Sequence, residues 1–584
     1  MKKAVRYIGY TFRDCYRAFP HFFLMTFWLD LTGIGAQVLA PVVLAHILEL
    51  AGGESVMQKK ELMGMICLYG VCLVCIPVTE AVFRAQSQKA RILGEKYFGS
   101  RLVAFSGKIR LEALENPETL DRFHRANAGE NSQFTLFEQM VFALRSAVTG
   151  IGLMFVVGRY SILLVVTGLL SLAPSVFTKL YFEKRLTRMR RMQSSILRRC
   201  SYLRGLFSKR DYVREMRVFG TETYLTDLWK QANAERAGEY YRTNLDIRKK
   251  QVYGIFVINL CYVCNVGLSF MLMVQGKLSV GAFAACLSAF TAYDAGMSNF
   301  LVMLFQAIST YHVVEDYYDY FSVPVETDGE KVYRPFYEKI EAKDVYFRYS
   351  GSDRDALAGL TCEIKKGEHV VIVGENGSGK TTFAKLLCGA YLPVQGGIFY
   401  DGQKTEELVR KSLYAHISAV PQDFVRYRFS LRENVGISAP ERMSDTEGME
   451  ALLSCVAGED FVRELGGLDV QLGREFGGQE LSGGEWQKVA IARGLWKECG
   501  IVILDEPTSA LDPLAEYGIL TKFVEMTQER TTVIISHRVG ICRTADRVIV
   551  MKDGRMAECG KHEELLAAGG EYARIWREQA KWYQ

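Results

Sequence analysis

Residues 374–381, with the sequence GENGSGKT, constrain the fold more than any other feature of the chain. They match the pattern GxxxxGK[S/T] of phosphate-binding loops, between an apolar strand-like run and a helical pattern at 381–388. In such a loop, backbone N–H groups close around phosphates and the helix N-terminus adds partial positive charge. Lys380 would reach the β- and γ-phosphates, and the Thr381 hydroxyl would ligate magnesium. We therefore expect an α/β domain that binds a nucleoside triphosphate.

Polar residues at the ends of further strand patterns predict the chemistry of this domain. The apolar run 501–504 ends in two carboxylates, and we predict that Asp505 holds magnesium through water and that Glu506 polarises the attacking water. His537 follows the strand pattern 531–535 and is predicted to hydrogen-bond the γ-phosphate. Gln422, after Val-Pro, is predicted to sense magnesium and the attacking water.

The N-terminal half contains long apolar runs. Two of them, 251–276 and 160–178, are uncharged and reach the roughly 20 residues needed to cross the hydrocarbon of a bilayer. A soluble protein with buried helices is the alternative, but soluble helices need a polar face, which these runs largely lack. The sequence predicts six spans, near residues 20–48, 62–83, 134–158, 160–182, 251–275 and 279–310.

Charges between the spans predict orientation. Basic residues precede the first span and follow the fourth, so the positive-inside rule places the N-terminus, the long loops and the C-terminal half in the cytoplasm. The net charge of +5 gives no argument for a nucleic-acid partner. The first apolar run has no small-residue cleavage pattern, so we expect no cleaved signal peptide. The 14 cysteines are expected to stay reduced and to serve mainly as packing.

The two long loops, 84–133 and 184–250, are predicted to be cytoplasmic extensions of the spans that turn and return. Each turn carries a short amphipathic segment, at 116–120 and 214–220, where Pro117 suits a helix start and Gly220 a C-terminal cap. The predicted organisation is a transmembrane domain at 1–322, a linker at 323–337 and an ATP-binding domain at 338–584.

A glycine pair in residues 481–485, LSGGE, precedes a helical pattern and ends twenty residues before Asp505 (505 − 485). It offers further backbone donors for phosphate. If it begins a separate helical region, it cannot fold back onto the Lys380 of its own chain.

Taken together and in this order, these motifs resemble those of ABC transporters, in particular an exporter-type half-transporter, over nearly the whole chain. The resemblance implies an α-helical transmembrane bundle with six spans and long cytoplasmic extensions. An α/β P-loop ATPase domain would follow, with an added antiparallel β subdomain and a helical signature subdomain.

The resemblance also implies a dimer with ATP and magnesium as ligands, in which the signature of one chain closes over ATP bound by the other. Residues 509–512 match the segment that crosses to the partner, and the segments near Asn116 and Glu215 match coupling helices. Thr381, Gln422 and Asp505 are the predicted magnesium ligands, and Glu506 and His537 the catalytic residues. The predicted nucleotide contacts are Tyr349 (stacked on adenine), Gly374, Glu375, Asn376, Gly377, Ser378, Gly379, Lys380, Thr381, Thr382, Gln422 and Asp505, with Ser482, Gly483, Gly484, Glu485 and Asp512 acting across the dimer.

Three features depart from the family pattern. The signature ends in Glu485 where glutamine is usual. The stretches 472–480 and 424–428 also differ from the usual sequences, at places where the domains of this family communicate. These departures concern coupling, whereas the residues for hydrolysis are intact.

We interpret the chain as an ATP-driven transporter of the bacterial cytoplasmic membrane that works by alternating access. A membrane-tethered ATPase acting on another protein is disfavoured by six spans, and an ATP-gated channel or sensor by the intact Glu506, His537 and signature. Export is the expected direction, with import of a metal-chelating compound as the alternative. The second half-transporter is either another copy or a different chain.

The sequence leaves the transported substrate open. Asp30, Arg145 and Asp294 fall within predicted spans, where charges are costly and usually face protein or water. They are candidates for binding a polar or charged substrate. Alternatively, they pair with one another or lie near the cytoplasmic interface.

Overall fold

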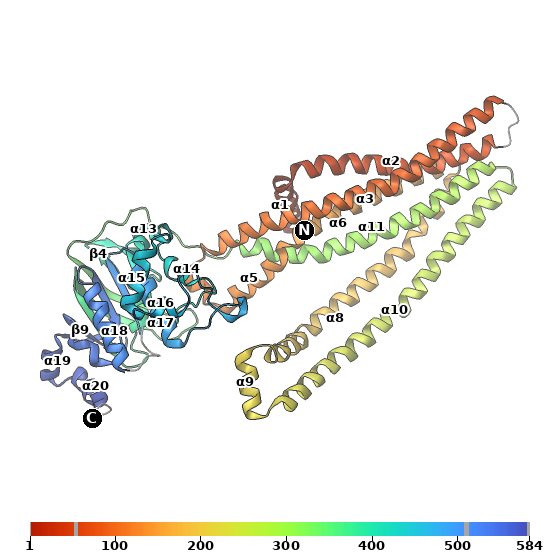
Figure 1. Ribbon diagram of the computed structural model, residues 1–584. Coiled ribbons are helices and arrows are strands. Elements are labelled where there is room, and N and C mark those ends of the chain that lie inside the picture. The colour runs from red at the N-terminus through yellow and green to blue at the C-terminus, as the bar shows by residue number, and fades with distance from the viewer. Residues whose placement is uncertain (1, 52–55, 507–512, 581–584) are drawn as a thin grey trace. The chain divides into compact units, whose positions relative to one another are not determined.

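The computed structural model describes residues 2–51, 56–506 and 513–580 (Figure 1). The chain divides into two compact units. The first comprises Met1–Gly107 and Leu120–Val323, and the second comprises Lys108–Thr119 and Pro324–Gln584.

The first unit consists of long helices. Helices α8 and α10 lie side by side with α9 across one end (Figure 1), and Leu203, Leu206 and Ala232 pack between them. Helix α5 begins at Pro117, and Gly220 caps α9 in the left-handed conformation at φ 63°, so both terminus predictions are confirmed. The helices are α1 (Lys2–Ala18), α2 (Pro20–Leu50), α3 (Val56–Ser106), α5 (Pro117–Glu130), α6 (Ser132–Gly158), α7 (Ile162–Leu170), α8 (Leu172–Leu206), α9 (Arg210–Phe219), α10 (Glu222–Val274) and α11 (Val280–Tyr320).

Five helices in the described residues are long and apolar enough to cross a membrane, namely α2, α3 from Lys59, α6, α10 and α11. The predicted span at 160–182 corresponds to a shorter apolar stretch, Ile162–Thr178, which is divided between α7 and α8 at Ser171. Pro174 explains the division, because it has no N–H to donate to the Leu170 carbonyl. At the division, the Ser171 hydroxyl donates to the Gly168 carbonyl at 2.7 Å.

The second unit contains the two sheets of the predicted α/β and antiparallel subdomains. The larger sheet has the order β10-β9-β3-β8-β7-β6, in which only the β10 pairing is antiparallel. Strands β3, β7 and β8 are buried throughout, which explains their continuous apolar sequences. The smaller sheet is antiparallel with the order β2-β1-β4-β5. The strands are β1 (Lys339–Phe347), β2 (Leu357–Lys365), β3 (His369–Gly374), β4 (Gln395–Tyr400), β5 (Gln403–Lys404), β6 (Ile417–Val420), β7 (Ile501–Asp505), β8 (Thr531–Ile535), β9 (Arg547–Lys552) and β10 (Arg555–Gly560).

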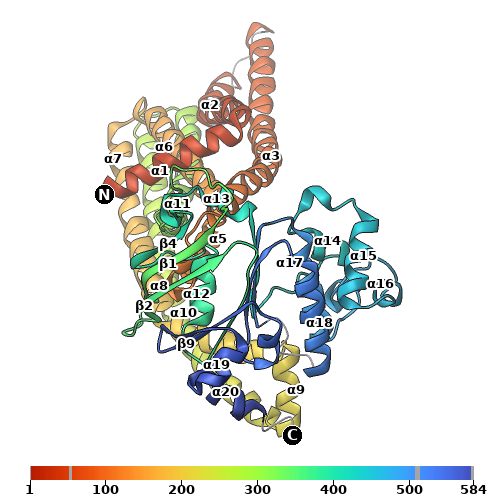
Figure 2. The ribbon, with the colours of Figure 1, turned by 90° about the vertical axis from the view of Figure 1, so that its left-hand side faces the viewer.

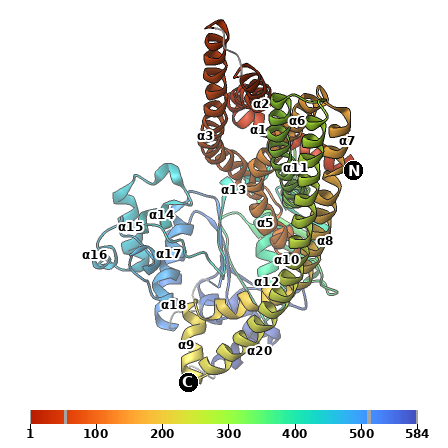
Figure 3. The ribbon, with the colours of Figure 1, turned by 90° about the vertical axis from the view of Figure 1, so that its right-hand side faces the viewer.

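Helices α14–α17 group together on one side of the sheets, and α19 and α20 lie beside another edge (Figures 2 and 3). The α14–α17 group has a core of its own around Trp486, Leu453 and Phe461, as expected for a separate helical subdomain. The helices of this unit are α4 (Leu111–Leu114), α12 (Lys380–Leu387), α13 (Arg410–Ala415), α14 (Leu431–Gly436), α15 (Thr446–Ala457), α16 (Phe461–Glu464), α17 (Gly483–Trp496), α18 (Pro513–Met526), α19 (His562–Ala568) and α20 (Glu571–Ala580), with short 3-10 turns at Thr405–Glu407, Pro440–Arg442, Arg474–Phe476 and Val539–Arg543.

The predicted linker, 323–337, belongs to the second unit from Pro324 onward. Its residue Glu326 donates its N–H to the Lys108 carbonyl at 2.7 Å, and the buried Arg410 reaches the Glu326 carboxylate at 3.3 Å. Tyr333 and Phe336 belong to the core of the same unit. The compact unit therefore begins before the predicted domain start at 338, and it includes the first amphipathic turn.

We predict that Arg410→Ala loosens this linker. The substitution leaves the Glu326 carboxylate and the buried Gly389 carbonyl, 3.2 Å from Arg410, without their guanidinium partner. The unfolding free energy should fall by about 1.5–3 kcal/mol. In Arg410→Ala, limited proteolysis should cleave the chain within 324–337 faster than in the wild type. The control is Lys411→Ala, which changes the exposed neighbouring residue and should be cleaved at the wild-type rate. Equal rates in all three proteins would contradict the assignment.

Candidate active site

The phosphate-binding loop connects β3 to α12, and its glycines are sterically required. Gly374, Gly377 and Gly379 have φ of 154°, 80° and 98°. A Cβ would lie 2.2 Å from the Met551 carbonyl oxygen at Gly374 and 2.6 Å from the Ala356 carbonyl oxygen at Gly379. Only glycine allows this closed path of the backbone.

Two polar side chains lie buried inside the loop. Lys380 is 5 % exposed, and its Nζ donates to the carbonyl oxygens of Gly374 and Glu375, each at 2.9 Å. The Ser378 hydroxyl is buried and has no hydrogen-bond partner among the described residues. A buried polar atom without a partner is costly unless a ligand satisfies it. Together with the glycine cradle, this orphaned hydroxyl fits a phosphate group.

The predicted catalytic and magnesium-binding residues gather at the carboxyl ends of β3, β6, β7 and β8. The Thr381 hydroxyl donates to Asp505 Oδ1 at 3.2 Å. Gln422 Nε2 donates to Glu506 Oε2 at 2.7 Å, and His537 Nε2 contacts the other oxygen, Oε1, of the same carboxylate. Ligands of parallel α/β sheets bind at this edge. The structure therefore brings together five residues from four separate segments of the sequence.

Glu506 has an uncommon backbone conformation. Its φ is 48°, in the left-handed region that non-glycine residues rarely adopt, while its N–H donates to the Ile535 carbonyl at 3.0 Å. Strained backbone persists where the surroundings hold it, and it concentrates at functional sites. The conformation marks Glu506 as a functional residue independently of its sequence motif.

Burial perturbs the titration of these groups. It raises the pKa of Asp505, with the Thr381 hydrogen bond opposing, and it raises the pKa of Glu506, with Lys380 opposing. Burial lowers the pKa of Lys380 against the attraction of Glu506. Burial, and then Lys380, also lower the pKa of His537, whose Nε2 contacts Glu506 Oε1. The site thus holds charges that desolvation disfavours.

Tyr349, the predicted adenine contact, lies at a cavity of about 350 Å³ that Phe347, Tyr391 and Val394 also line. Its hydroxyl is 3.1 Å from the Thr382 hydroxyl, which ties it to the helix that follows the phosphate-binding loop. The ring centroids of Tyr349 and Tyr391 are 5.9 Å apart. The geometry places an aromatic face beside the loop.

The predicted signature forms the N-terminus of α17. Ser482 and Glu485 make a capping box: Ser482 donates its N–H to Glu485 Oε2 at 2.7 Å, and Glu485 donates its N–H to Ser482 Oγ at 3.3 Å. The departure from glutamine therefore has a local role, because the carboxylate caps the helix. Gly483 and Gly484 form the first turn. Asp512, with the rest of 509–512, lies outside the described residues.

The two other departures from the family pattern contact each other. Arg428 Nε is 3.1 Å from Glu475, and Arg428 Nη1 is 3.8 Å from Glu480. A side chain at Gly473 would collide with Arg428, with its Cβ 2.6 Å from Arg428 Cδ. The unusual sequences thus belong to one contact between the loop after Gln422 and the loop before Ser482.

The candidate substrate residues differ in their surroundings. Arg145 Nη1 on α6 lies 3.5 Å from Asp30 Oδ1 on α2, and both side chains are largely buried. Asp294 on α11 makes no hydrogen bond or ion pair with any residue of the described ranges. Asp30 and Arg145 therefore balance each other's charge. Asp294 remains as the candidate for binding the substrate.

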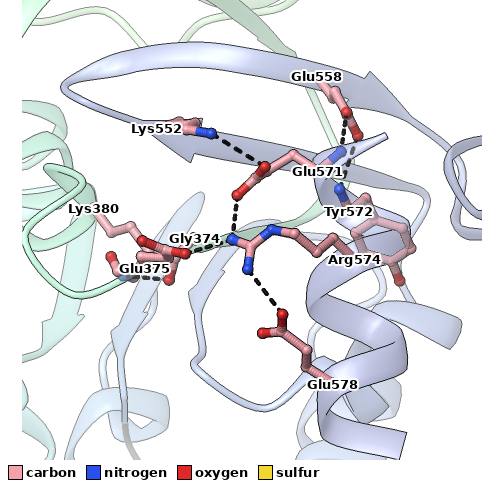
Figure 4. A network of polar contacts seen from close by, with 9 residues as sticks. All are labelled: Gly374, Glu375, Lys380, Lys552, Glu558, Glu571, Tyr572, Arg574 and Glu578. Atoms are coloured by element: carbon pink, nitrogen blue, oxygen red, sulfur yellow. Dashed lines mark hydrogen bonds and ion pairs between the residues drawn. The ribbon is translucent and has the colours of Figure 1, made fainter. Parts of the chain in front are cut away.

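Sequence reasoning missed two residues of α20. Arg574 binds Glu375 of the phosphate-binding loop, and Gln579 binds the backbone at His537 (Arg574 is shown in Figure 4). No motif marks them, because their role depends on where α20 packs.

Comparison with known proteins gives consistent results. Residues 357–509 match the family described as "ABC transporter". The chain is 29% identical over 476 residues to the subtilin transport ATP-binding protein of Bacillus subtilis (79% of this chain, 76% of the relative). It is 26% identical over 533 residues to the nisin transport ATP-binding protein of Lactococcus lactis (88% and 87%). An ATP-dependent lipid A-core flippase of Bordetella avium is 35% identical over 52% of this chain and 51% of its own.

A solved structure described as a bacterial Atm1-family ABC exporter with ATP bound has the same fold. Its TM-score is 0.83 at 23% identity, and the match covers 96% of this chain and 98% of the other.

Residues 357–509 thus match the ABC transporter family, and the chain fuses this ATPase domain to a helical membrane domain with the fold of an ABC exporter half-transporter. It is a multi-pass membrane protein that couples ATP hydrolysis to transport across a membrane. ABC half-transporters function as dimers.

We predict that Asp505→Asn raises the melting temperature of the nucleotide-free protein. Asparagine keeps an acceptor for Thr381 and removes a charge that burial disfavours. The gain should be a few degrees at pH 7.5, since 1 kcal/mol corresponds to about 2–4 °C in domains of this size.

The pH dependence gives the control. Because the folded pKa of Asp505 is raised, its stabilising effect is present at low pH and is lost as pH rises through that pKa. The advantage of Asp505→Asn should therefore shrink as pH falls. The exposed Asp353→Asn should show no advantage at either pH, and a pH-independent gain in Asp505→Asn would contradict the burial argument.

Proposed function

We propose that two copies of this chain form an exporter that hydrolyses Mg·ATP at two composite sites. Each site would join the phosphate-binding loop of one copy to the signature of the other. The observation that carries the catalytic part of this proposal is the Glu506 carboxylate, held by Gln422 at 2.7 Å and by His537. A carboxylate fixed by two donors beside a phosphate cradle is suited to orient water.

The phosphate-binding loop would hold the triphosphate through its backbone N–H groups and Lys380. Thr381, Gln422 and Asp505 would hold magnesium, which when bound neutralises charge on the β- and γ-phosphate oxygens. The Thr381 hydroxyl and the Asp505 carboxylate are already 3.2 Å apart. Tyr349 would stack on the adenine.

Glu506 would act as general base. Its pKa is raised by burial, which brings it closer to the working pH and increases its affinity for the proton of the attacking water. The His537 ring contacts the carboxylate from one side and would hydrogen-bond the γ-phosphate when ATP is present. Proton acceptance by Glu506 contributes on the order of 10² to 10⁴ in rate.

A second copy is the proposed partner because one chain carries both halves of the composite site. Ser482 and Glu485 cap α17, which packs on one side in the helical core and on the other in a sheet core distinct from that of α12. The positive end of α17 would then face the nucleotide of the other copy, with Asp512 nearby. If the partner proves to be a different half-transporter, this part of the proposal is wrong.

The membrane half supports a peptide substrate. The relative named for nisin transport matches 88% of this chain, so the similarity includes most of the membrane domain, which determines substrate choice in transporters. The flippase match covers 52%. We infer export of a lantibiotic-type peptide from the cytoplasm across the bacterial cytoplasmic membrane. Asp294 would bind a cationic group of this substrate.

We predict that Glu506→Gln retains ATP binding and loses nearly all steady-state hydrolysis. Glutamine keeps the shape of the side chain but cannot accept the proton. ATP binding and phosphate release, measured on the full chain in lipid vesicles, should separate by at least about 100-fold. Lys380→Ala should instead weaken binding itself, because a phosphate charge loses its partner. Near-normal turnover of Glu506→Gln would contradict the role of the base.

We predict that Asp294→Asn changes peptide-stimulated ATPase activity more than basal activity. Loss of a charge-assisted hydrogen bond should raise the half-maximal concentration of a stimulating cationic peptide about tenfold or more. The control is Asp246→Asn, an exposed carboxylate paired with Lys250 outside the predicted spans. Equal effects on stimulated and basal activity would leave Asp294 with a structural role only.

A further inference from the structure

Helix α20 contacts two loops of the candidate active site, which follow the neighbouring strands β3 and β8. It starts at Glu571, and its residues Arg574 and Gln579 reach the phosphate-binding loop and the loop after β8, respectively. Neither residue belongs to a motif of the sequence. These two contacts place α20 at the candidate active site.

The helix is firmly anchored at its N-terminus. The Glu558 carboxylate on β10 accepts the N–H of Glu571 at 2.5 Å and of Tyr572 at 3.1 Å, which satisfies two free donors of the first turn. Gly570 makes room for this cap, because a Cβ there would lie 2.0 Å from Glu558 Oε1. Tyr572 is fully buried in the core of the unit. The helix therefore has a fixed position.

Arg574 connects this helix to the phosphate-binding loop (Figure 4). Its guanidinium binds Glu375 and also reaches Glu571 at 2.5 Å and Glu578 at 3.0 Å. Lys552 on β9 approaches Glu571 at 3.3 Å from the other side. Glu375 is the loop residue whose carbonyl accepts from Lys380 Nζ at 2.9 Å. The ion pair thus restrains the backbone that surrounds Lys380.

Gln579 connects the same helix to the histidine loop. Its Nε2 donates to the His537 carbonyl, and its Oε1 accepts the Val539 N–H at 3.0 Å. One side-chain amide therefore holds the backbone on both sides of Arg538. This is the backbone that sets the position of the His537 ring, which contacts Glu506.

We propose that α20 is a strut that sets the position of the phosphate-binding loop relative to the histidine loop, with Arg574 and Gln579 as positioning residues for hydrolysis. This inference rests on the proposed roles of His537 and Lys380. The Arg574 side chain is 41% exposed, and exposed ion pairs contribute little to stability. Its effect should therefore be seen in the kinetics rather than in the melting temperature.

The two contacts predict different kinetic defects. In the full chain reconstituted in lipid vesicles, Gln579→Ala should lower kcat about five- to tenfold, because the backbone at His537 and Val539 loses its two hydrogen bonds with Gln579, while KM for ATP stays within about twofold. Arg574→Ala should raise KM and the Kd for ATP about three- to tenfold with a smaller effect on kcat. Arg574→Lys should restore part of the affinity.

The chain offers matched controls. Arg577 is exposed on the same helix and has no hydrogen bond or ion pair with the described residues, so Arg577→Ala should match the wild type in both constants. Glu375→Gln removes the Arg574 ion pair from the loop side and should reproduce the weaker ATP binding. The double variant Arg574→Ala/Glu375→Gln should show little further loss. This pair keeps the test decisive if one variant fails to fold.

The outcomes separate the strut from the proposed function. If His537→Ala loses turnover while Gln579→Ala and Arg574→Ala behave as Arg577→Ala, the strut is wrong and the catalytic assignment stands. If His537→Ala keeps wild-type turnover, the assignment of His537 itself is wrong. A fall in kcat and in ATP affinity that merely follows a fall in melting temperature would also overturn the strut.

Discussion

The structure of the ATPase unit depends on charges held at one buried edge of a parallel sheet. Strands β3, β7 and β8 are buried along their length, and at their ends they position Lys380, Asp505, Glu506 and His537. Burial disfavours the ionised forms of the lysine and both carboxylates. Such an arrangement has a cost in stability and is retained where it is needed for function. Binding of a Mg²⁺-bound triphosphate would supply the missing counter-charges.

The elements around this edge hold the site residues in position. Glycines that no other residue can replace close the phosphate-binding loop, and the left-handed conformation of Glu506 directs its carboxylate toward Gln422 and His537. Helix α20 holds two of the loops from outside. The helical subdomain has a separate core and presents the N-terminus of α17, capped by its own Ser482 and Glu485. This separation supports the proposal that a second copy completes the site.

Local patterns predicted the part of the structure that local chemistry determines. The phosphate-binding loop, the apolar strands, Pro117 and Gly220 could be predicted because each depends on neighbouring residues. The division of the predicted fourth span at Ser171 was missed, although Pro174 was the available signal. The contacts of Arg410, Arg428, Arg574 and Gln579 join segments far apart in sequence. A single sequence contains no periodicity that pairs them. The Asp30–Arg145 pair was anticipated only as one alternative, because the relative rotation of α2 and α6 is a tertiary property.

A complementation experiment with two inactive variants tests the composite site most directly. Ser482→Arg should block the signature, and Lys380→Ala should disable the phosphate-binding loop, so each chain alone should lose ATP hydrolysis. In mixed dimers one site combines both defects and the other has neither, so co-reconstituted chains should recover a substantial fraction of the wild-type rate. Wild-type hydrolysis by Ser482→Arg alone, or no recovery in isolated mixed dimers, would contradict a site shared between two copies.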